Sequence, residues 1–232
     1  VLLNQVRLGF DPQNLLVAQV PQIGEVLCGP QGPGLLDRLS SLPGVQAVGA
    51  ATVLPPRHSG TRMDMSVADD PVEHLVCRQE VTPGYFRAMG VPVVRGRGIT
   101  DQDVEGSVHI VVVNETFVER VCGGVDPIGK ELVMHTPNPI YQRRDTIVGV
   151  VKDIANQTLL EATEPEAYYS YRQGGIYADS LVLRIGADPW RIAIPVREAI
   201  RETIGKDHPI SIETMRERLA GSILPQRFQT IV

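Results

Sequence analysis

The sequence predicts an α+β protein in which a split α/β unit is interrupted by an inserted, mostly β subdomain. Two observations carry this prediction. The chain begins and ends with a strand–helix–strand pattern, and the long segment between the two patterns is richer in turns and strands. We expect the two end units to pair into one layer, which would place both chain ends on the same subdomain.

The first end unit spans residues 15–53. Residues 15–20 are apolar and typical of a strand, and a helix over residues 35–42 would carry four leucines on one face. Pro43 and Gly44 end that helix, and residues 45–53 favour a second strand.

The second end unit starts with residues 181–185, whose alternation predicts a strand. Asp188 and Pro189 begin a helix that runs to Ile204, and residues 209–212 start another strand. Pro195 lies inside this helix, where a proline costs about 3 kcal/mol in a regular interior. We therefore expect a kink, two helical pieces, or a helix that begins only at Pro195.

A last helix is predicted after the second unit, because Thr214 and Glu217 have the spacing of a capping box. Met215, Leu219 and Ile223 would share one stripe of this helix, and Pro225 would end or kink it.

The middle segment contains two short helices in the prediction. Thr82 and Pro83 form a helix start, Gly90 forms a stop, and the residues between them place Tyr85, Phe86 and Met89 on one face. Residues 108–113 form a buried strand, after which Asn114 can cap a helix that carries Phe117, Val118 and Val121.

Two loops mark where the chain crosses between the subdomains. The first is the Pro- and Gly-containing segment 55–60, and the second is the segment 173–175. We therefore expect the first half of the α/β unit over residues 1–57, the insert over 58–176, the second half over 177–213 and the final helix over 214–232. Pro55-Pro56 and Gly174-Gly175 are the hinge candidates.

Bulk composition excludes some classes of function. A net charge of −5 and a pI of about 5.6 argue against non-specific nucleic-acid binding. No apolar run approaches the length of about 20 residues that spans a bilayer, and no signal-peptide pattern opens the chain, so these residues alone predict a soluble protein. The three cysteines are interpreted as buried small hydrophobic residues rather than disulfide partners.

Several motifs resemble functional sites but lack an essential part. Residues 124–130 match GxxxxGK, yet Glu131 follows instead of Ser or Thr, so we predict a tight turn leading into a strand over 131–134. Asp101, Asp103 and Glu105 mimic a calcium loop whose twelfth position is Val112, so a solvated acidic loop is favoured.

The remaining candidate side chains also have structural interpretations. Asn114 and Asn156 match the glycosylation pattern, but Asn114 is interpreted as a helix cap. Trp190 is expected to pack on the sheet rather than to anchor a partner. The tyrosine group Tyr168, Tyr169, Tyr171 and Tyr177 is interpreted as a strand over 168–173 with alternating aromatic faces, although an exposed aromatic and arginine patch for a partner stays open. The histidines are scattered and match no metal or nucleophile motif: His58, His74, His109, His135 and His208.

We therefore assign no catalytic, cofactor-binding or metal-binding residue and expect no cofactor. A catalytic triad could arise only through tertiary folding, which the linear spacing does not reveal.

The order of several motifs resembles a known family. VTPGYFRAMGVPVVRGRGIT, VVVNETFVERV and DPIGKEL are similar to the MacB-like periplasmic core domain of FtsX-type ABC transporter permeases, particularly the large orphan permeases. SLPGVQAVGAATVLPP, DTIVGVVKDI and the segment from Asp188 to Leu219 fit the same order. In this family a proline usually occupies the place of Ser170.

The resemblance implies a porter-like α/β subdomain interrupted by a sabre-like insert, located outside the cell membrane. It implies no enzymatic activity, membrane helices beyond both chain ends, and ATP hydrolysis by a separate cytoplasmic subunit or domain. It also implies a dimer or pseudo-dimer and a possible periplasmic adaptor, with the domain transmitting membrane-helix motion to a substrate or partner. The alternatives are a domain that senses a peptide or small ligand and, less favoured, a free-standing hydrolase.

Overall fold

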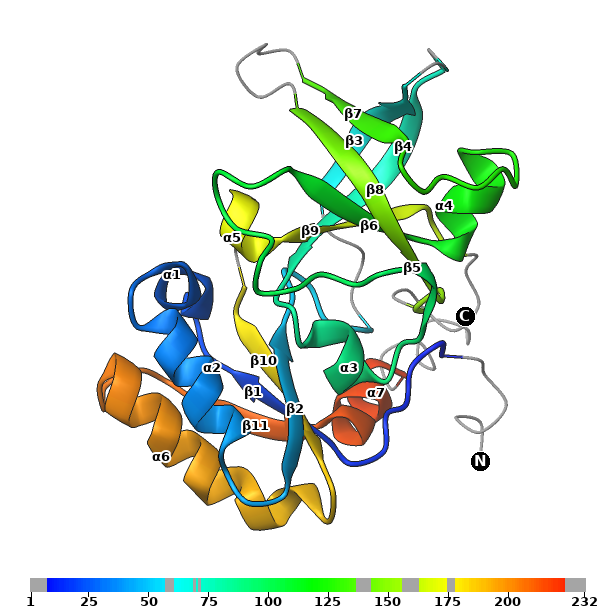
Figure 1. Cartoon of the computed structure of the whole chain (residues 1–232). Helices are drawn as coiled ribbons and strands as arrows, with labels where there is room; N and C mark the ends of the chain where they lie inside the picture. The colour runs from blue at the N-terminus through cyan, green and yellow to red at the C-terminus, as the bar shows by residue number, and fades with distance from the viewer. Residues whose placement is uncertain are drawn as a thin grey trace, which may run out of the picture.

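A computed structural model describes residues 8–56, 61–68, 70, 72–136, 143–155, 163–174 and 178–223, with side chains to 221. The described residues form two β-sheets with helices around them, as Figure 1 shows. The predicted α+β class is therefore confirmed. The predicted subdomain boundaries fall on or beside residues outside this description and stay predictions.

The smaller sheet combines both ends of the chain. Its four strands are β1 (Leu15–Gln19), β2 (Val45–Ala50), β10 (Ser180–Ile185) and β11 (Ser211–Thr214). They lie in the order β11-β1-β10-β2, and each neighbouring pair is antiparallel. The two end units thus interleave, and their βαββαβ connection is that of a ferredoxin-like sheet.

One face of this sheet is covered by α1 (Ile23–Cys28), α2 (Gly32–Ser40) and α6 (Ala193–Ile204) (Figure 1). Apolar side chains of these helices and of the sheet form one buried cluster, which includes Leu16, Leu27, Leu39, Leu183, Val196 and Ile200. The helix predicted over 35–42 is confirmed in α2, whereas α1 was not predicted.

The helix predicted from Asp188 consists of two pieces. Residues Pro189–Ile192 form a 3-10 turn, and α6 follows directly from Ala193. Pro195 is the third residue of α6, so it lies in the first turn, where a backbone N–H has no partner within the helix. This arrangement confirms the two-piece alternative and removes the cost of an interior proline.

The insert is built on a seven-stranded sheet that curls on itself. Strands β8-β6-β9-β4-β3-β7 are neighbours in that order, and β7 also pairs with β8, so six strands close into a small barrel. Strand β5 extends the edge of β8 beyond the part that pairs with β7. The strands are β3 (Thr61–Val67), β4 (His74–Val81), β5 (Val93–Gly96), β6 (Ile110–Asn114), β7 (Glu131–His135), β8 (Arg143–Val151) and β9 (Glu166–Ser170).

Helix α4 (Glu115–Arg120) packs against the barrel core through Phe117 and Val118. Asn114 caps it as predicted, since its Oδ1 accepts hydrogen bonds from the N–H groups of Phe117 (2.9 Å) and Glu166 (3.0 Å). Asn114 is fully buried, which is incompatible with glycosylation at this site. Asn156 lies outside the described residues.

Helix α3 (Tyr85–Met89) belongs to the insert by sequence but packs on the opposite face of the smaller sheet, against β2 and β10. The predicted apolar face is confirmed, because Tyr85, Phe86 and Met89 are buried. The predicted cap is wrong: the helix begins after Gly84, and the Thr82 hydroxyl instead accepts a hydrogen bond from the Ala50 N–H (2.8 Å).

Two short helices complete the fold. Helix α5 (Tyr171–Gly174) follows β9, and α7 (Met215–Ile223) follows β11. The predicted capping box of α7 is confirmed, since Thr214 N–H donates to Glu217 Oε2 (2.8 Å) and Glu217 N–H donates to Thr214 Oγ1 (3.2 Å). The side chain of Ile223 and residue Pro225 lie outside the description.

Candidate functional site

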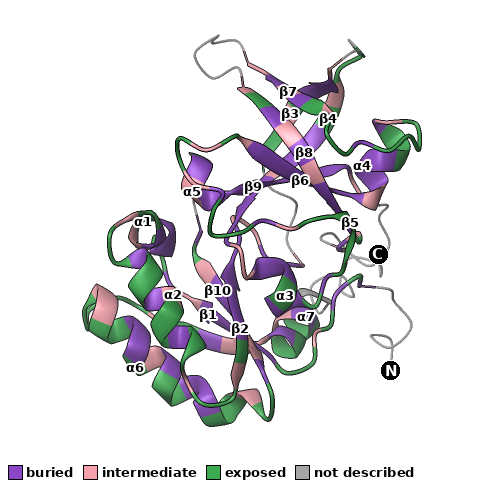
Figure 2. Ribbon diagram, in the orientation of Figure 1, coloured by how far each residue is buried: buried purple, intermediate pink, exposed green. Residues whose placement is uncertain are grey.

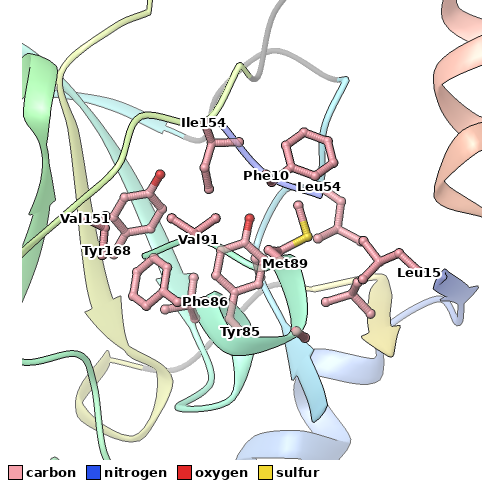
Figure 3. Close-up of a cluster of buried hydrophobic side chains, with 14 of the residues drawn as sticks. Phe10, Leu15, Leu54, Tyr85, Phe86, Met89, Val91, Val151, Ile154 and Tyr168 are labelled. Carbon is pink, nitrogen blue, oxygen red and sulfur yellow. The ribbon is translucent and has the colours of Figure 1, made fainter. Parts of the chain in front are cut away.

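The two sheets share one hydrophobic cluster, which we call the junction core. Leu15 and Val182 contribute from the smaller sheet, Tyr168 and Val151 from the barrel, and Met89 from α3 between them. Figure 3 shows Leu15, Met89, Val151 and Tyr168 packed around the α3 segment, together with other members of the cluster: Phe10, Leu54 and Ile154. Figure 2 shows that the strands leading into this region are mostly buried. The junction core therefore joins the smaller sheet and the insert into one packed body. We call the smaller sheet the base sheet, and this sheet together with α1, α2 and α6 the base.

Helix α3 reaches the junction core because two glycines allow it to lie directly on β2. A Cβ at Gly49 would lie 2.5 Å from the Cα of Tyr85, and a Cβ at Gly84 would lie 2.0 Å from the carbonyl oxygen of Val48. No side chain fits at either position without moving backbone atoms. Close backbone contact thus holds the insert against the base.

The chain enters the insert through a segment that is already hydrogen-bonded to β4. Ala51 forms a β-bridge with Val81, and the Thr52 N–H donates to the Glu80 carbonyl (3.0 Å). The Thr52 hydroxyl donates to Glu80 Oε2 (2.7 Å) and accepts from the Glu80 N–H (3.1 Å). We call residues 51–56 the crossing segment. Its pairing with β4 makes it part of the packed junction.

The tyrosines near the chain's return are buried and reach three different cores. Tyr168 lies in the junction core, Tyr169 in the barrel core, and Tyr171 in the core beneath α1, α2 and α6. The predicted alternating strand is confirmed over residues 168–170, which belong to β9, but it is wrong from Tyr171 onward, where α5 begins. The exposed aromatic patch is wrong for Tyr168, Tyr169 and Tyr171, which are all buried. Tyr177 lies outside the described part of the chain.

Ser170, where the resemblance predicts a proline, forms a specific contact. Its hydroxyl donates to the Asp103 carbonyl oxygen (2.6 Å) and so ties β9 to the acidic loop. Gln173 Nε2 donates to the Val108 carbonyl (2.8 Å) and to Ser107 Oγ (2.9 Å) in the same loop. This loop is thus attached to the strand that links all three cores.

The acidic loop is not uniformly solvated, which corrects the sequence-based interpretation. Asp101 and Glu105 are exposed, but Asp103 is buried. The Arg97 Nη1 and Nη2 atoms each donate a hydrogen bond of 2.8 Å to one oxygen of the Asp103 carboxylate. Burial acts to raise the pKa of Asp103, but hydrogen bonds from Arg97 and Thr100 outweigh it and lower the pKa below its usual value. A basic residue six positions before the aspartate was the only sequence signal for this pair.

A second buried carboxylate lies inside the barrel. Asp145 accepts a hydrogen bond from Arg143 Nε, and His109 Nδ1 lies 3.7 Å from its Oδ1. Burial raises the pKa of Asp145 above its usual value, although Arg143, His109 and Arg78 act in the opposite direction. Arg78 and Arg143 also lie over the ring of Tyr169, with guanidinium carbons 5.1 and 5.4 Å from its centroid.

Two grooves run along the boundary between the base helices and the insert. The larger one, of about 550 Å³, lies between α1–α2 and the acidic loop, where Cys28, Glu105 and Arg172 line it. The second, of about 340 Å³, lies between α2, β2 and the start of α3, where Asp37, Arg87 and Asp101 line it. These grooves are where a small ligand could enter.

The structure brings one serine and one histidine together in the insert. Ser66 Oγ lies 2.7 Å from His135 Nε2, and Glu73 Oε1 lies 3.7 Å from His135 Nδ1. Ser66 is only 5% exposed and sits within β3, so a substrate carbonyl has no access to its hydroxyl. This arrangement does not form a nucleophilic site. His58 lies outside the described residues, and among the described ones no group of side chains could hold a metal ion.

The other sequence motifs have structural roles or none. Residues 124–130 turn into β7 as predicted, and no helix follows Gly129 as a phosphate loop would require. Trp190 is 48% exposed, so its predicted packing on the sheet is wrong; Ile192 is the buried residue of that turn. None of the three cysteines forms a disulfide. Cys77 is buried and Cys28 is exposed, so the prediction of buried cysteines is wrong for Cys28.

Comparison with known proteins gives one consistent answer. A family model described as the MacB-like periplasmic core domain matches residues 2–200. The structure is similar to the periplasmic region of MacB from Actinobacillus actinomycetemcomitans (16% identity, 97% of this chain and 96% of that chain, TM-score 0.60). It is also similar to the extracellular domain of the noncanonic ABC-type transporter YknZ from Gram-positive bacteria (14% identity, 86% and 100%, TM-score 0.58). No curated protein sequence matches, and within the described residues no helix is long and apolar enough to cross a membrane.

Proposed function

Because this chain belongs to the MacB-like periplasmic core domain family, and is therefore an extracytoplasmic domain of an ABC transporter permease, we propose that it transmits ATP-driven movement of membrane helices to a substrate or partner outside the membrane. Permeases of this family work with cytoplasmic ATPase subunits, so the energy source lies outside this domain. In the proposed cycle two copies face each other as a dimer or pseudo-dimer, and an adaptor can dock on the insert.

The junction core is the observation that supports this proposal most directly. A domain that transmits force must not yield between the point where force enters and the point where it acts. Leu8 and Leu219, near the two ends of the described chain, lie in the same cluster as Tyr168 and Val112 of the barrel. Displacing either end therefore requires the insert to move or the cluster to open, and opening it exposes apolar surface at about 25 cal/mol per Å².

This core also bears on the predicted hinge. Rotation about Pro55 or Gly174 stays a prediction, and Gly175 lies outside the described residues. A wide rotation would separate side chains that the two subdomains share, so the packing favours small movements of one body.

Spin labels on the full-length transporter test the proposal. Leu75 is 56% exposed and is the second residue of β4, a strand that Figure 1 shows reaching the part of the insert farthest from the smaller sheet. In a Cys28→Ser, Cys122→Ser background, Leu75→Cys gives a label on each insert of a dimer. We expect the label-to-label distance distribution to differ between the nucleotide-free and ATP-trapped states. An unchanged distribution, with ATP hydrolysis intact, would contradict force transmission.

The grooves favour ligand sensing as the second candidate function. A ligand held between α2 and the acidic loop would contact both the base and the insert and could bias their relative position. Calorimetric titration of the chain with candidate peptides or small molecules tests this, and Glu105→Gln with Arg172→Gln should abolish any binding that occurs in the larger groove. Saturable binding, with no nucleotide-dependent change in the Leu75 distance, would favour sensing over transmission.

A further inference from the structure

The segments nearest the two ends of the described chain each contact the base sheet and also either the insert or the crossing segment that leads into it. The first is residues 8–13, which we call the N-terminal strap, and the second is helix α7. In Figure 1 both lie on the same side of the smaller sheet, opposite α1, α2 and α6. Their contacts indicate how movement of the chain ends would reach the insert.

Helix α7 holds the crossing segment through Arg218. The side chain of Arg218 is 9% exposed, and its Nε donates to the carbonyl oxygen of Pro55 (2.9 Å). Its Nη1 donates to Glu213 Oε1 (2.9 Å), which also accepts from Gln19 Nε2 on β1 (3.1 Å). One guanidinium therefore joins α7 to the base sheet and to the crossing segment at once.

The apolar side of α7 makes the same connection. Leu219 lies one residue after Arg218 and packs in the junction core, where Leu54 of the crossing segment is also buried. The crossing segment continues into the backbone pairing of Thr52 with Glu80 on β4. Displacement of α7 thus has a continuous route through Pro55 and Thr52 to the barrel.

The N-terminal strap holds the insert at a different place. The Leu8 carbonyl accepts a hydrogen bond from the Ala155 N–H (2.9 Å), just after β8. Gly9 has a φ of +73°, and a Cβ there would lie 1.7 Å from the Asp153 carbonyl oxygen, so the strap presses backbone to backbone against the insert. Asp153 in turn accepts hydrogen bonds from the N–H (2.9 Å) and hydroxyl (2.8 Å) of Thr116 in α4.

We propose that the strap and α7 hold the insert at two separate points, and that Arg218 is the positioning residue through which displacement of α7 reaches the crossing segment. This inference rests on the proposed function for its biological meaning, while its structural part stands on the contacts alone. The two contacts then act beside the junction core, through which the base sheet also packs against the insert.

Amide hydrogen exchange on the 232-residue chain tests the structural part. Arg218→Met keeps the apolar stem but removes both hydrogen bonds, so we expect the Thr52 amide to exchange about tenfold faster, the usual effect of losing one charged hydrogen bond. Amides at the centre of β10 should be unchanged. Arg216→Met is the matched control, because Arg216 lies exposed on the same helix and should leave exchange at wild-type values.

Arg218→Lys separates geometry from charge. Lysine can pair with Glu213 but has no planar fork to reach Pro55 at the same time, so Thr52 should exchange as fast as in Arg218→Met. The inference is overturned if Thr52 exchange is unchanged in Arg218→Met, if lysine restores it fully, or if exchange rises equally throughout the chain.

The full-length transporter tests the functional part. With Leu75→Cys labels on the insert and Ile194→Cys labels on the exposed face of α6, Arg218→Met should reduce the nucleotide-dependent change at Leu75 but not at Ile194. If the wild-type transporter shows no nucleotide-dependent change at either position, the proposed function fails while the exchange result still decides the coupling. Equal changes at Leu75 with and without Arg218 would refute the coupling alone.

Discussion

At the scale of single residues, two of the buried carboxylates, Asp103 and Asp145, are expected to have opposite responses to pH. Asp103 accepts two hydrogen bonds from Arg97, and these lower the pKa of Asp103 although burial acts to raise it. Burial raises the pKa of Asp145. A lowered pKa means that folding favours the charged form, and a raised pKa means that folding favours the neutral form. The contributions of the two carboxylates to the free energy of unfolding should therefore change with pH in opposite directions.

Asp103 should stabilise the fold above its unfolded pKa of about 4 and lose that contribution as the pH falls through its lower folded value. We expect Asp103→Asn to lower the free energy of unfolding at pH 7 by about 2 kcal/mol, because two charged hydrogen bonds are weakened. Urea unfolding at pH 7 and pH 3 checks this, and the deficit should shrink at pH 3. Asp101→Asn, which changes an exposed carboxylate two residues away, should differ little from wild type at either pH.

Asp145 should behave in the opposite sense. Its stabilising contribution is fully present below about pH 4 and is lost as the pH rises through its raised folded pKa. We expect the difference in unfolding free energy, wild type minus Asp145→Asn, to fall between pH 4 and pH 8. Urea midpoints across that range measure it, with Arg143, His109 and Arg78 unchanged in both proteins. A difference that rises with pH would show that the arginines, rather than burial, dominate this site.

At the scale of elements, the contact of α3 with β2 depends on glycine. Gly49→Ala places a methyl group 2.5 Å from the Cα of Tyr85, so α3 must shift away from the sheet. We expect a loss of about 1–3 kcal/mol in the free energy of unfolding, the usual cost of overpacking. Thermal or urea unfolding measures it.

Gly34 in α2 provides the control for that change. A Cβ at Gly34 meets nothing within 4 Å, so Gly34→Ala should be neutral or stabilising by up to about 1 kcal/mol. Equal losses in the two alanine variants would mean that close packing at β2 is not the cause.

Elements whose signals are local could be predicted from the sequence. Asn114 caps a helix by accepting a hydrogen bond from the Phe117 N–H three residues later. Thr214 and Glu217 form a capping box, and Gly90 ends α3 at a φ of +72°. In each case the residue that sets the backbone lies within one turn of the residue it affects. Such signals do not depend on the rest of the fold.

Features that depend on distant contacts could not be predicted. Thr82 has the form of a helix cap, but its hydroxyl binds Ala50, which lies 32 residues away in sequence. Closure of the barrel requires β8 to pair with both β6 and β7, and no pattern in the sequence encodes that register. The hydrogen bond from Arg218 to the Pro55 carbonyl joins residues 163 positions apart, and no local sequence pattern predicts it.

At the scale of the whole molecule, the junction core determines whether the two subdomains unfold together or separately. A chain of 232 residues is long enough for its subdomains to unfold separately. Here, however, side chains from both sheets lie in one cluster with α3, the strap and α7. Unfolding either subdomain would expose to water the apolar surface that the other buries against it, so the remaining subdomain would lose that stabilisation.

We therefore expect one unfolding transition for both subdomains. Trp190, the only tryptophan, reports on the base, and the thiol of Cys77, 1% exposed on β4, reports on the insert. In a Cys28→Ser, Cys122→Ser background, the urea midpoint from Trp190 fluorescence should coincide with that from pulsed labelling of Cys77. Disruption of the shared cluster by Tyr168→Ala should separate the two midpoints. Distinct midpoints in the protein that retains Tyr168 would mean that the two subdomains are mechanically independent. A domain that yields between the base and the insert could not carry force from the chain ends to the barrel.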